Sequence, residues 1–320
     1  MPSLRKTSPT TRSTRNPAAE SLSAEQLVDR VAQGDCLQRL ESLQHFGPYQ
    51  LIYLDPPFNA GGLRRAREGS GQRASGRAAY IDFWGGLDRF LEMLRPRLAA
   101  LAEMLTADGS LWVHLDHRAV HDVKLELDRI FGRAHFAGEV IWVPGNGGKR
   151  RSGPSVTHQT LLIYRRGARM IWNDGDSALR EPFSETSLKM HFNQRDAHGR
   201  RYRERVIQGK AYRYYADEGR RIGSVWSDCP AMNANTPLKK ETTGYPTQKP
   251  ERLLERIVRA ATTPTGAVLD PMCGSGTTLA VALRLGRGFA GCDQSELACR
   301  ITRERLRAEL ENMGARRAHA

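Results

Sequence analysis

The sequence predicts an α/β fold. Short apolar runs of strand length alternate with longer segments in which apolar residues recur at helical spacing. Two of the short runs, LIYL and AVL, lead directly into an aspartate and a tight turn. Because ligands bind beyond the carboxyl ends of the strands in open α/β sheets, we expect the functional site at these turns.

The first half of the chain supplies most of the expected elements. Residues 1–19 are predicted to form a disordered basic arm, and residues 60–79, made largely of Gly, Ser, Arg and Ala, a mobile loop. Asp35 follows a short apolar stretch and precedes a helical pattern that runs to Leu43. The other expected elements are strands over residues 50–54, 110–115, 138–143 and 158–166 and helices over residues 87–105 and 119–130.

This regular pattern is interrupted once, by residues 169–243, which are polar, rich in Arg and Tyr, and without a long periodic stretch. Beyond the interruption we expect helices over residues 250–261, 279–285 and 296–310 and strands over residues 267–270 and 289–293. Residues 20–168 and 244–311 are therefore predicted to form one domain in two sequence pieces, separated by an insert and followed by a tail over residues 312–320.

The chain is basic, with 49 Lys and Arg residues against 35 Asp and Glu residues and a net charge of +14. The excess lies in three zones, residues 1–19, 59–80 and 145–245, and the remainder is slightly acidic. Because neutralisation of phosphates by Lys and Arg dominates affinity for nucleic acids, this distribution favours a polyanionic partner. The alternative interpretation is a solvated surface rich in Arg because of a GC-rich genome.

Composition excludes several classes of protein. No apolar run approaches the length of a membrane-spanning helix, which is about 18 residues. The basic N-terminal segment lacks the apolar core of a secretory signal. The five cysteines include no C-x-x-C pair, which argues against a zinc ribbon or a disulfide scaffold. We therefore expect a soluble cytosolic protein.

A glycine-rich turn follows the predicted strand that ends at Asp270. The segment VLDPMCGSGTT brings an acidic residue to the strand end, and its small residues let a ligand approach the backbone at a helix N-terminus. Asp293 ends the next strand, where a carboxylate can bind ribose hydroxyls. Leu279 replaces the third glycine of the dinucleotide-binding pattern, which disfavours NAD. Taken alone, the turn is also consistent with a purely structural connection.

A second turn, Asp55-Pro56-Pro57-Phe58, follows the apolar run LIYL. Two prolines stiffen it and leave carbonyl groups without competing N–H donors. Asp55 and the Pro57 carbonyl can accept the two N–H bonds of a planar amine, and Phe58 can stack on its ring. A proline turn with a capping Asp is the alternative if the motif is considered alone.

The ordered combination of DPPF (55–58), YPTQKP (245–250) and DPMCGSGTT (270–278) resembles the β group of amino-methylating DNA methyltransferases. In that group the catalytic motif precedes the target-recognition region, which precedes the S-adenosylmethionine motif. The resemblance covers residues 30–168 and 244–310. It implies a Rossmann-like S-adenosylmethionine methyltransferase fold with a mixed, mostly parallel sheet, circularly permuted, in which the insert is the target-recognition region.

The resemblance also implies roles for individual residues. The target base is held by Asp55, Pro56, Pro57 and Phe58. S-adenosylmethionine is bound by Asp35 near its adenine, by Asp293 at its ribose, by Thr247 and Lys249 near its methionine end, and by the turn residues Asp270, Pro271, Gly274, Ser275 and Gly276. Two features depart from the family: Met272 stands where Phe is usual, and we can assign the insert to no named pattern.

The implied permutation is physically reasonable, because a sheet whose termini lie close together can be cut and rejoined without altering its core. It predicts that the strand before Asp35 and the strand that ends at Asp293 are neighbours in the sheet.

The implied reaction is methyl transfer to N6 of adenine in double-stranded DNA after base flipping. An exocyclic amine is a poor nucleophile, so acceptors that hold its hydrogens and stabilise the developing positive charge promote the transfer. The alternatives are cytosine N4 methylation, an RNA or protein-glutamine methyltransferase, and a DNA-binding protein without catalysis. Aspartate at position 55 favours adenine by resemblance, since cytosine enzymes often carry Ser there.

Double-stranded DNA is the expected partner, and the nucleoid-associated cytoplasm is the expected location. No membrane partner is expected. The resemblance also allows a homodimer and a cognate restriction endonuclease as a separate chain.

Three further patterns receive little weight. Cys273 lies in the glycine-rich turn, but no Pro-Cys dipeptide marks a nucleophile for cytosine C5. His114, His117 and His121 have helix-like spacing, but His114 ends a predicted strand and no nearby Cys completes a ligand set, so no metal is expected. The segment GNGGK (145–149) lacks the Ser or Thr that a phosphate-binding loop needs.

Overall fold

The computed structural model describes residues 23–58, 61–66, 76–145, 147–148, 151–232 and 241–318. The predicted basic arm, the middle of the predicted mobile loop, part of the GNGGK segment and part of the insert lie outside these residues. In the part of the chain that is described, no helix is both long and apolar enough to cross a membrane.

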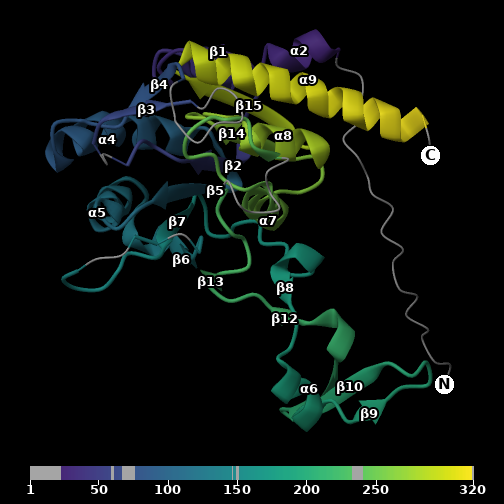
Figure 1. Ribbon diagram of the computed structural model, residues 1–320. Helices are drawn as coiled ribbons and strands as arrows, with labels where there is room; N and C mark the ends of the chain where they lie inside the picture. The colour runs from purple at the N-terminus through teal and green to yellow at the C-terminus, as the bar shows by residue number, and fades with distance from the viewer. Residues whose placement is uncertain are drawn as a thin grey trace.

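A single mixed sheet runs through the main body (Figure 1). Its strands within the described residues are, in order, β1 (Val31–Gln33), β15 (Gly288–Asp293), β14 (Ala267–Asp270), β2 (Tyr49–Leu54), β5 (Leu105–Leu115), β7 (Gln159–Arg165), β6 (Phe136–Trp142) and β13 (Val225–Trp226). The strands from β1 to β5 in this order are parallel, and β7 is antiparallel to both of its neighbours. The predicted mixed, mostly parallel sheet is confirmed.

Helices cover both faces of this sheet. They are α2 (Ala24–Val28), α3 (Leu40–Gln44), α4 (Leu87–Glu103), α5 (Val120–Phe131), α7 (Glu251–Ala261), α8 (Thr277–Arg284) and α9 (Glu296–Ala318). Alternation along β2 shows why the sheet is buried on both sides. Leu51 and Tyr53 pack in the apolar cluster with α7, α8 and α9, whereas Ile52 and Leu54 pack in the cluster with α3, α4 and α5.

The first and last strands of the sheet along the chain, β1 and β15, are neighbours, as the permutation predicts. Strand β1 pairs in parallel with β15, with Val31 opposite Gly291 and Gln33 opposite Asp293. Strand β14 pairs in parallel with β2, with Val268 opposite Leu51. The strands that lead into the two motifs are therefore neighbours, and the motifs leave the same edge of the sheet.

Several predicted boundaries differ from the structure. Helix α4 ends at Glu103 because Leu105 already pairs with Tyr49 of β2. The prediction of a mobile loop over residues 60–79 is wrong at residues 63–65 and 78–79, which belong to the antiparallel strands β3 (Leu63–Arg65) and β4 (Ala78–Ile81). Pairing of Arg64 with the buried Asp82 at 2.9 Å stabilises these strands. Helix α9 continues to Ala318, through residues predicted to be tail.

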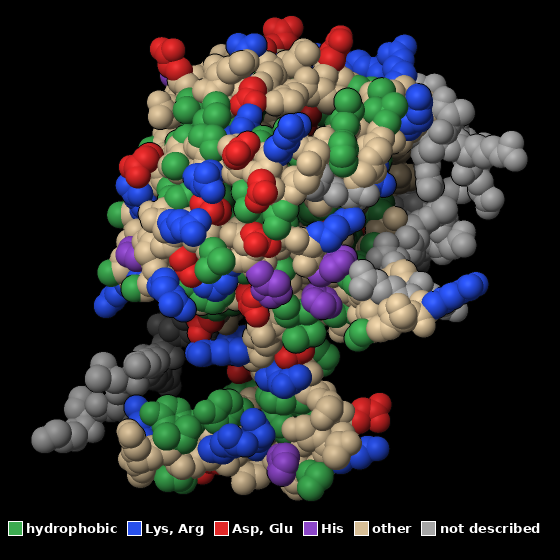
Figure 2. All heavy atoms as spheres, turned by 90° about the vertical axis from the view of Figure 1, so that its left-hand side faces the viewer, with side chains coloured by type: hydrophobic (Ala, Val, Ile, Leu, Met, Phe, Trp, Pro, Cys, Tyr) green, Lys and Arg blue, Asp and Glu red, His purple; other side chains and the backbone are tan. Residues whose placement is uncertain are grey.

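The insert forms a lobe that protrudes from the main body (Figures 1 and 2). Its regular elements are η2 (Ser177–Leu179), β8 (Arg180–Glu181), α6 (Glu185–His191), β9 (Gln194–Arg195), β10 (Arg201–Ile207), β11 (Lys210–Tyr215), η3 (Ala216–Glu218) and β12 (Arg220–Arg221), and the main body adds η1 (Arg133–His135). Phe183 and Phe192 form a small core, with ring centres 4.6 Å apart. Trp226 is buried on β13 of the main sheet, and the partly exposed Trp172 stacks on Trp112 with ring centres 6.4 Å apart, so both aromatics contact the main body.

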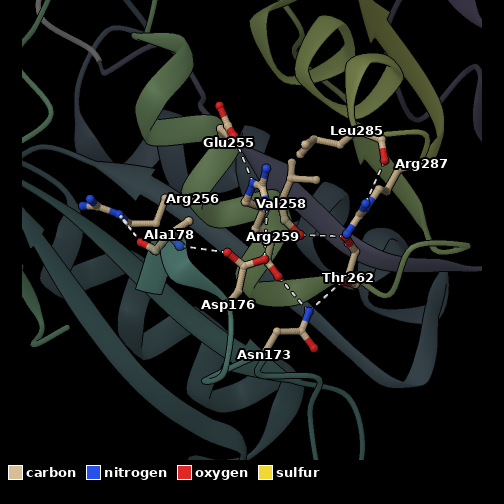
Figure 3. Close-up of polar contacts among 10 residues, drawn as sticks. All are labelled: Asn173, Asp176, Ala178, Glu255, Arg256, Val258, Arg259, Thr262, Leu285 and Arg287. Atoms are coloured by element: carbon tan, nitrogen blue, oxygen red, sulfur yellow. Dashed lines mark hydrogen bonds and ion pairs between the residues drawn. The ribbon is translucent and has the colours of Figure 1, made fainter. Parts of the chain in front are cut away.

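The start of the insert is attached to the end of α7 by polar contacts (Figure 3). The Asn173 side chain donates to the carbonyl oxygens of Arg259 at 2.7 Å and Thr262 at 2.8 Å. Asp176 forms an ion pair with the Arg259 side chain at 3.2 Å. Arg256 donates from Nε to the Ala178 carbonyl at 3.0 Å. Because α7 directly follows the TQKP segment, these contacts connect the insert to an element that carries site residues.

Candidate functional site

A cavity of about 530 Å³ lies at the carboxyl ends of β2 and β14. Its walls are the turns after these two strands, the end of β15, strand β4 and the segment 245–249. This volume is within the range of about 300–1,000 Å³ that is usual for small-molecule sites. The position is the one expected for ligand binding in an open α/β sheet.

All four residues of the DPPF motif line this cavity. They follow β2 without a break, so the strand end presents the Asp55 carboxylate to the cavity. Burial raises the pKa of the Asp55 carboxyl above its usual range, an effect that Lys249 opposes. The motif thus combines a largely buried acceptor with a half-buried aromatic ring at the wall of the cavity.

Lys249 forms an ion pair with this carboxylate. Its Nζ lies 2.5 Å from Asp55 Oδ2 and 5.1 Å from the centre of the Phe58 ring. The resemblance assigned Lys249 to the methionine end of the cofactor, whereas here its ammonium contacts the target-base motif.

A buried histidine packs against the same motif. His114 on β5 is fully buried, its Nδ1 is hydrogen bonded to the Tyr53 hydroxyl at 2.7 Å, and its ring centre lies 6.1 Å from that of Phe58. Burial lowers the pKa of the His114 imidazole well below its usual range, so the ring is neutral. Sequence reasoning considered His114 only as a metal ligand and missed this supporting position.

The glycine-rich turn wraps around the end of β14. Asp270, Pro271, Gly274 and Ser275 line the cavity, but Gly276 does not. Gly276 has φ 71°, and a Cβ there would lie 2.6 Å from Thr302 Cγ2. Its small size therefore serves the close approach of the turn to α9. Gly274 has φ 52° and faces the Tyr245 ring.

Two carboxyl groups of this wall are strongly influenced by burial. Burial raises the pKa of Asp270 to about 7, and the Met272 backbone N–H donates to its Oδ1 at 3.2 Å. Burial also raises the pKa of Asp293, which accepts hydrogen bonds from the backbone N–H groups of Gly274 at 2.9 Å and Ser295 at 2.8 Å. The second acidic residue is thus oriented by the turn that follows the first.

Asp35 does not line the cavity. Its carboxylate forms an ion pair with Arg97 and accepts a hydrogen bond from Gln294 Nε2 at 2.8 Å. Both of these partners do line the cavity, so Asp35 contacts the cavity wall from behind. Sequence reasoning missed Arg97. The sequence feature that could have identified Arg97 is its position on the buried face of α4, between Leu94 and Leu98, where a charged residue is unusual.

Thr247 lines the cavity, where its hydroxyl is hydrogen bonded to the Tyr80 hydroxyl at 3.1 Å. Tyr80 in turn stacks on Tyr245, with ring centres 6.3 Å apart. Strand β4, whose first two residues were predicted to belong to a mobile loop, therefore forms one wall of the site. The local composition of residues 60–79 carries little signal for this wall.

The remaining sequence patterns supply neither a thiolate nucleophile nor a metal centre. Cys273 is buried and lines the cavity, and burial raises the pKa of its thiol well above the usual range, which disfavours a thiolate nucleophile. Within the described residues, no three side chains of His, Cys, Asp or Glu are grouped as metal ligands.

Comparison with known proteins identifies the family. The sequence model of the N6/N4 DNA methylase family matches residues 49–304, which is most of the chain. The chain therefore belongs to this family of DNA methyltransferases.

Relatives with curated descriptions are Type II methyltransferases. The chain is 26% identical over 312 residues to M.EcaI of Enterobacter cloacae, in a match that covers 83% of this chain and 66% of the relative, just under two thirds of its length. It is 27% identical to M2.DpnII of Streptococcus pneumoniae, over 82% of this chain and 83% of the relative.

Solved structures share the fold at lower identity. The crystal structure of M1.HpyAVI in complex with S-adenosylmethionine has a TM-score of 0.52 and 18% identity, covering 86% of this chain and 98% of that one. The PvuII DNA methyltransferase, which is cytosine-N4-specific, has a TM-score of 0.53 and 16% identity, covering 86% and 85%. These similarities confirm the predicted methyltransferase fold class.

Proposed function

We propose that the protein is a site-specific DNA methyltransferase that uses S-adenosylmethionine to methylate N6 of adenine in double-stranded DNA, with the target base flipped out of the helix. The observation that carries this proposal is the meeting of two motifs in one cavity. The DPPF turn and the glycine-rich turn leave adjacent parallel strands, β2 and β14, and both line the same space.

The residues present fit S-adenosylmethionine. Asp293 offers a carboxylate for ribose hydroxyls, and the turn from Asp270 to Ser275 offers backbone without bulky side chains. Asp35 would support the adenine end through Arg97 and Gln294, and Thr247 would lie near the methionine end. When bound, the cofactor supplies a methyl group already activated on a sulfonium.

The chain's own residues prepare the amine. Asp55 and a carbonyl of the proline turn accept the N–H bonds of the exocyclic amino group, and Phe58 stacks on the base. These acceptors stabilise the positive charge that develops on nitrogen, so proton loss can follow transfer and no strong base is needed. Enzymes that act on a base of a duplex take it out of the stack to reach the target atom, which is why flipping is part of the proposal.

The insert is proposed to recognise the DNA sequence through one face of the β10–β11 hairpin. Arg205 lies opposite Tyr212, and Ile207 lies opposite Lys210 on the same face. Neither Arg205 nor Lys210 forms an ion pair within the described residues, whereas Arg213 on the other face is paired with Glu204 at 3.2 Å. The first face thus leaves its positive charge and its exposed Tyr212 and Ile207 available to phosphates and bases.

Adenine is preferred to cytosine because the motif begins with Asp55 rather than the Ser that cytosine enzymes often carry. Cytosine N4 methylation remains the second candidate, since the same acceptors suit either amine. The Type II relatives support a role beside a separate restriction endonuclease.

Nucleoside mass spectrometry tests the proposal. Unmethylated duplex DNA is incubated with S-adenosylmethionine and the wild-type protein, Asp55→Ala, or the control Asp122→Ala on α5, outside the cavity lining. We expect N6-methyladenine with the wild type and the control, and a loss of about 10²- to 10³-fold or more for Asp55→Ala.

The outcomes separate the candidates. N4-methylcytosine in place of N6-methyladenine would correct the base and keep the mechanism. Methylation of RNA or of a glutamine side chain, with none in DNA, would overturn the substrate class.

A further inference from the structure

An ammonium group lies where the proposed target base would be recognised. Lys249 Nζ contacts Asp55 Oδ2 at 2.5 Å and lies 5.1 Å from the centre of the Phe58 ring. The two side chains of the ion pair are only 9% and 19% exposed. The lysine is therefore too close to the motif to serve the cofactor alone.

The segment that carries Lys249 is held by its own hydrogen bonds. Gln248 accepts from the Thr243 backbone N–H at 2.9 Å and donates to the Glu241 carbonyl at 2.7 Å. Thr247 has φ 59° and is hydrogen bonded to Tyr80. Helix α7 begins directly after this segment. Lys249 thus projects from an anchored support toward Asp55.

The ion pair occupies only part of the carboxylate. Oδ2 accepts from Lys249, while Oδ1 makes no hydrogen bond within the described residues, and Asp55 lines the cavity. An ionised carboxylate can accept several hydrogen bonds, so one oxygen remains for a ligand.

We propose that Lys249 is a positioning residue for Asp55, which fixes one carboxylate oxygen, keeps the group ionised and presents the other oxygen to the target amine. This assignment rests on the proposed function. It identifies Lys249 as the residue that sets the pH range over which methyl transfer is active.

The surroundings of Asp55 explain why such a partner is needed. The groups around it are Tyr53 on β2, Tyr80 on β4, Asp82 after β4, His114 on β5, Asp270 on β14 and Lys249. Burial raises the pKa of Asp55 and Asp82 adds to this, whereas Lys249 lowers it. His114 carries no charge because burial lowers its pKa. Lys249 is thus the group that opposes protonation.

The pKa of Asp55 determines how methyl transfer depends on pH. A protonated carboxyl is a poorer acceptor than a carboxylate, so activity falls as the pH drops through the pKa of Asp55. Removal of Lys249 raises this pKa and moves the loss of activity to higher pH. An opposite charge in contact shifts a carboxyl pKa by about one to three units, which sets the expected displacement.

The test compares Lys249→Met, Lys249→Arg and the control Lys124→Met on α5, which removes a lysine outside the cavity lining. Single-turnover methylation is measured against pH, and S-adenosylmethionine affinity by calorimetry. We expect the acid limb of Lys249→Met to move up by about one to three pH units. Lys249→Arg and Lys124→Met should retain the wild-type limb, and Lys249→Met should bind cofactor within about threefold of wild type.

A readout without turnover keeps this test independent of the proposed function. The Asp55 carboxyl is followed by ¹³C NMR of labelled aspartate, assigned with Asp55→Asn, in the wild type and Lys249→Met. A higher pKa in Lys249→Met supports the assignment even if the wild type methylates no DNA. An unchanged Asp55 pKa in Lys249→Met would overturn the assignment. So would an unmoved acid limb together with a loss of cofactor affinity of about tenfold, which would indicate that Lys249 binds the cofactor.

Discussion

The Asp293 carboxylate accepts a hydrogen bond from the Gly274 backbone N–H at 2.9 Å, which joins the end of β15 to the turn after β14. Its other oxygen accepts from Ser295 at 2.8 Å. The residue proposed to bind ribose is therefore also a brace for the glycine-rich turn.

Replacing Asp293 should impair both roles. An Asn side chain has only one acceptor oxygen. Its amide N–H₂ group would face one of the two backbone N–H donors, which would lose its acceptor. We expect Asp293→Asn to lower the free energy of unfolding by about 1–3 kcal/mol and to weaken S-adenosylmethionine binding. Thermal denaturation and calorimetry measure the two effects. Glu296→Gln at the start of α9 is the control, and equal behaviour of the two variants would contradict the bracing role.

Asp270 should make stability depend on pH. Because burial raises its pKa to about 7 in the folded protein, the folded state retains a proton that the unfolded chain has lost above its ordinary pKa. The stabilising contribution of this group is present at low pH and is lost as the pH rises to about 7. Asp270→Asn should therefore stabilise the protein, relative to wild type, at about pH 8 and have little effect at about pH 4.

The measurement is the difference in melting temperature between Asp270→Asn and wild type across this range, without cofactor. The exposed Asp108→Asn is the control, with no such trend expected. A difference that does not change with pH would argue against a buried carboxyl that titrates near neutrality.

Gly276→Ala should destabilise the fold. Its φ of 71° disfavours a side chain, and the new Cβ would lie 2.6 Å from Thr302 Cγ2. We expect a loss of about 1–3 kcal/mol in chemical denaturation. Gly314→Ala on α9 meets nothing within 4 Å, and it should stabilise the helix by about 0.5–1 kcal/mol. Effects of the same sign would contradict this account of Gly276.

The hairpin face should contribute to DNA affinity in a salt-dependent way. Arg205→Ala with Lys210→Ala removes two unpaired positive charges, so the slope of log affinity against log salt should decrease by about two. Arg213→Ala, whose guanidinium is paired with Glu204, should change the slope less. Fluorescence anisotropy with a labelled duplex measures both. Equal slopes for all variants would place the DNA contacts elsewhere on the protein.

Local chemistry was enough to predict much of this protein. Short apolar runs and helical spacing located nearly all elements of the main sheet and its helices, because these patterns depend on neighbours in sequence. The motifs at Asp55 and Asp270 were also predictable, since an acidic residue and a rigid or small turn after an apolar run mark a strand end.

Other features depended on assembly. The strand at 63–65 and the start of the strand at 78–81 were predicted to be loop, because their stability comes from pairing and from Asp82 rather than from local apolar residues. Gly276 was assigned to the cofactor, but its contact with Thr302 of α9 exists only once α8 and α9 pack together.

Sequence patterns therefore carried the fold class, the order of the motifs and the chemistry that each motif can perform, because strand, helix and turn preferences are short-range. The tertiary structure decided which groups meet. Lys249 and Asp55 are 194 residues apart in the chain, and they meet only where the segment before α7 lies against the turn after β2 in the folded protein. No local pattern encodes such a pair, since its distance is set by the packing of every element between them.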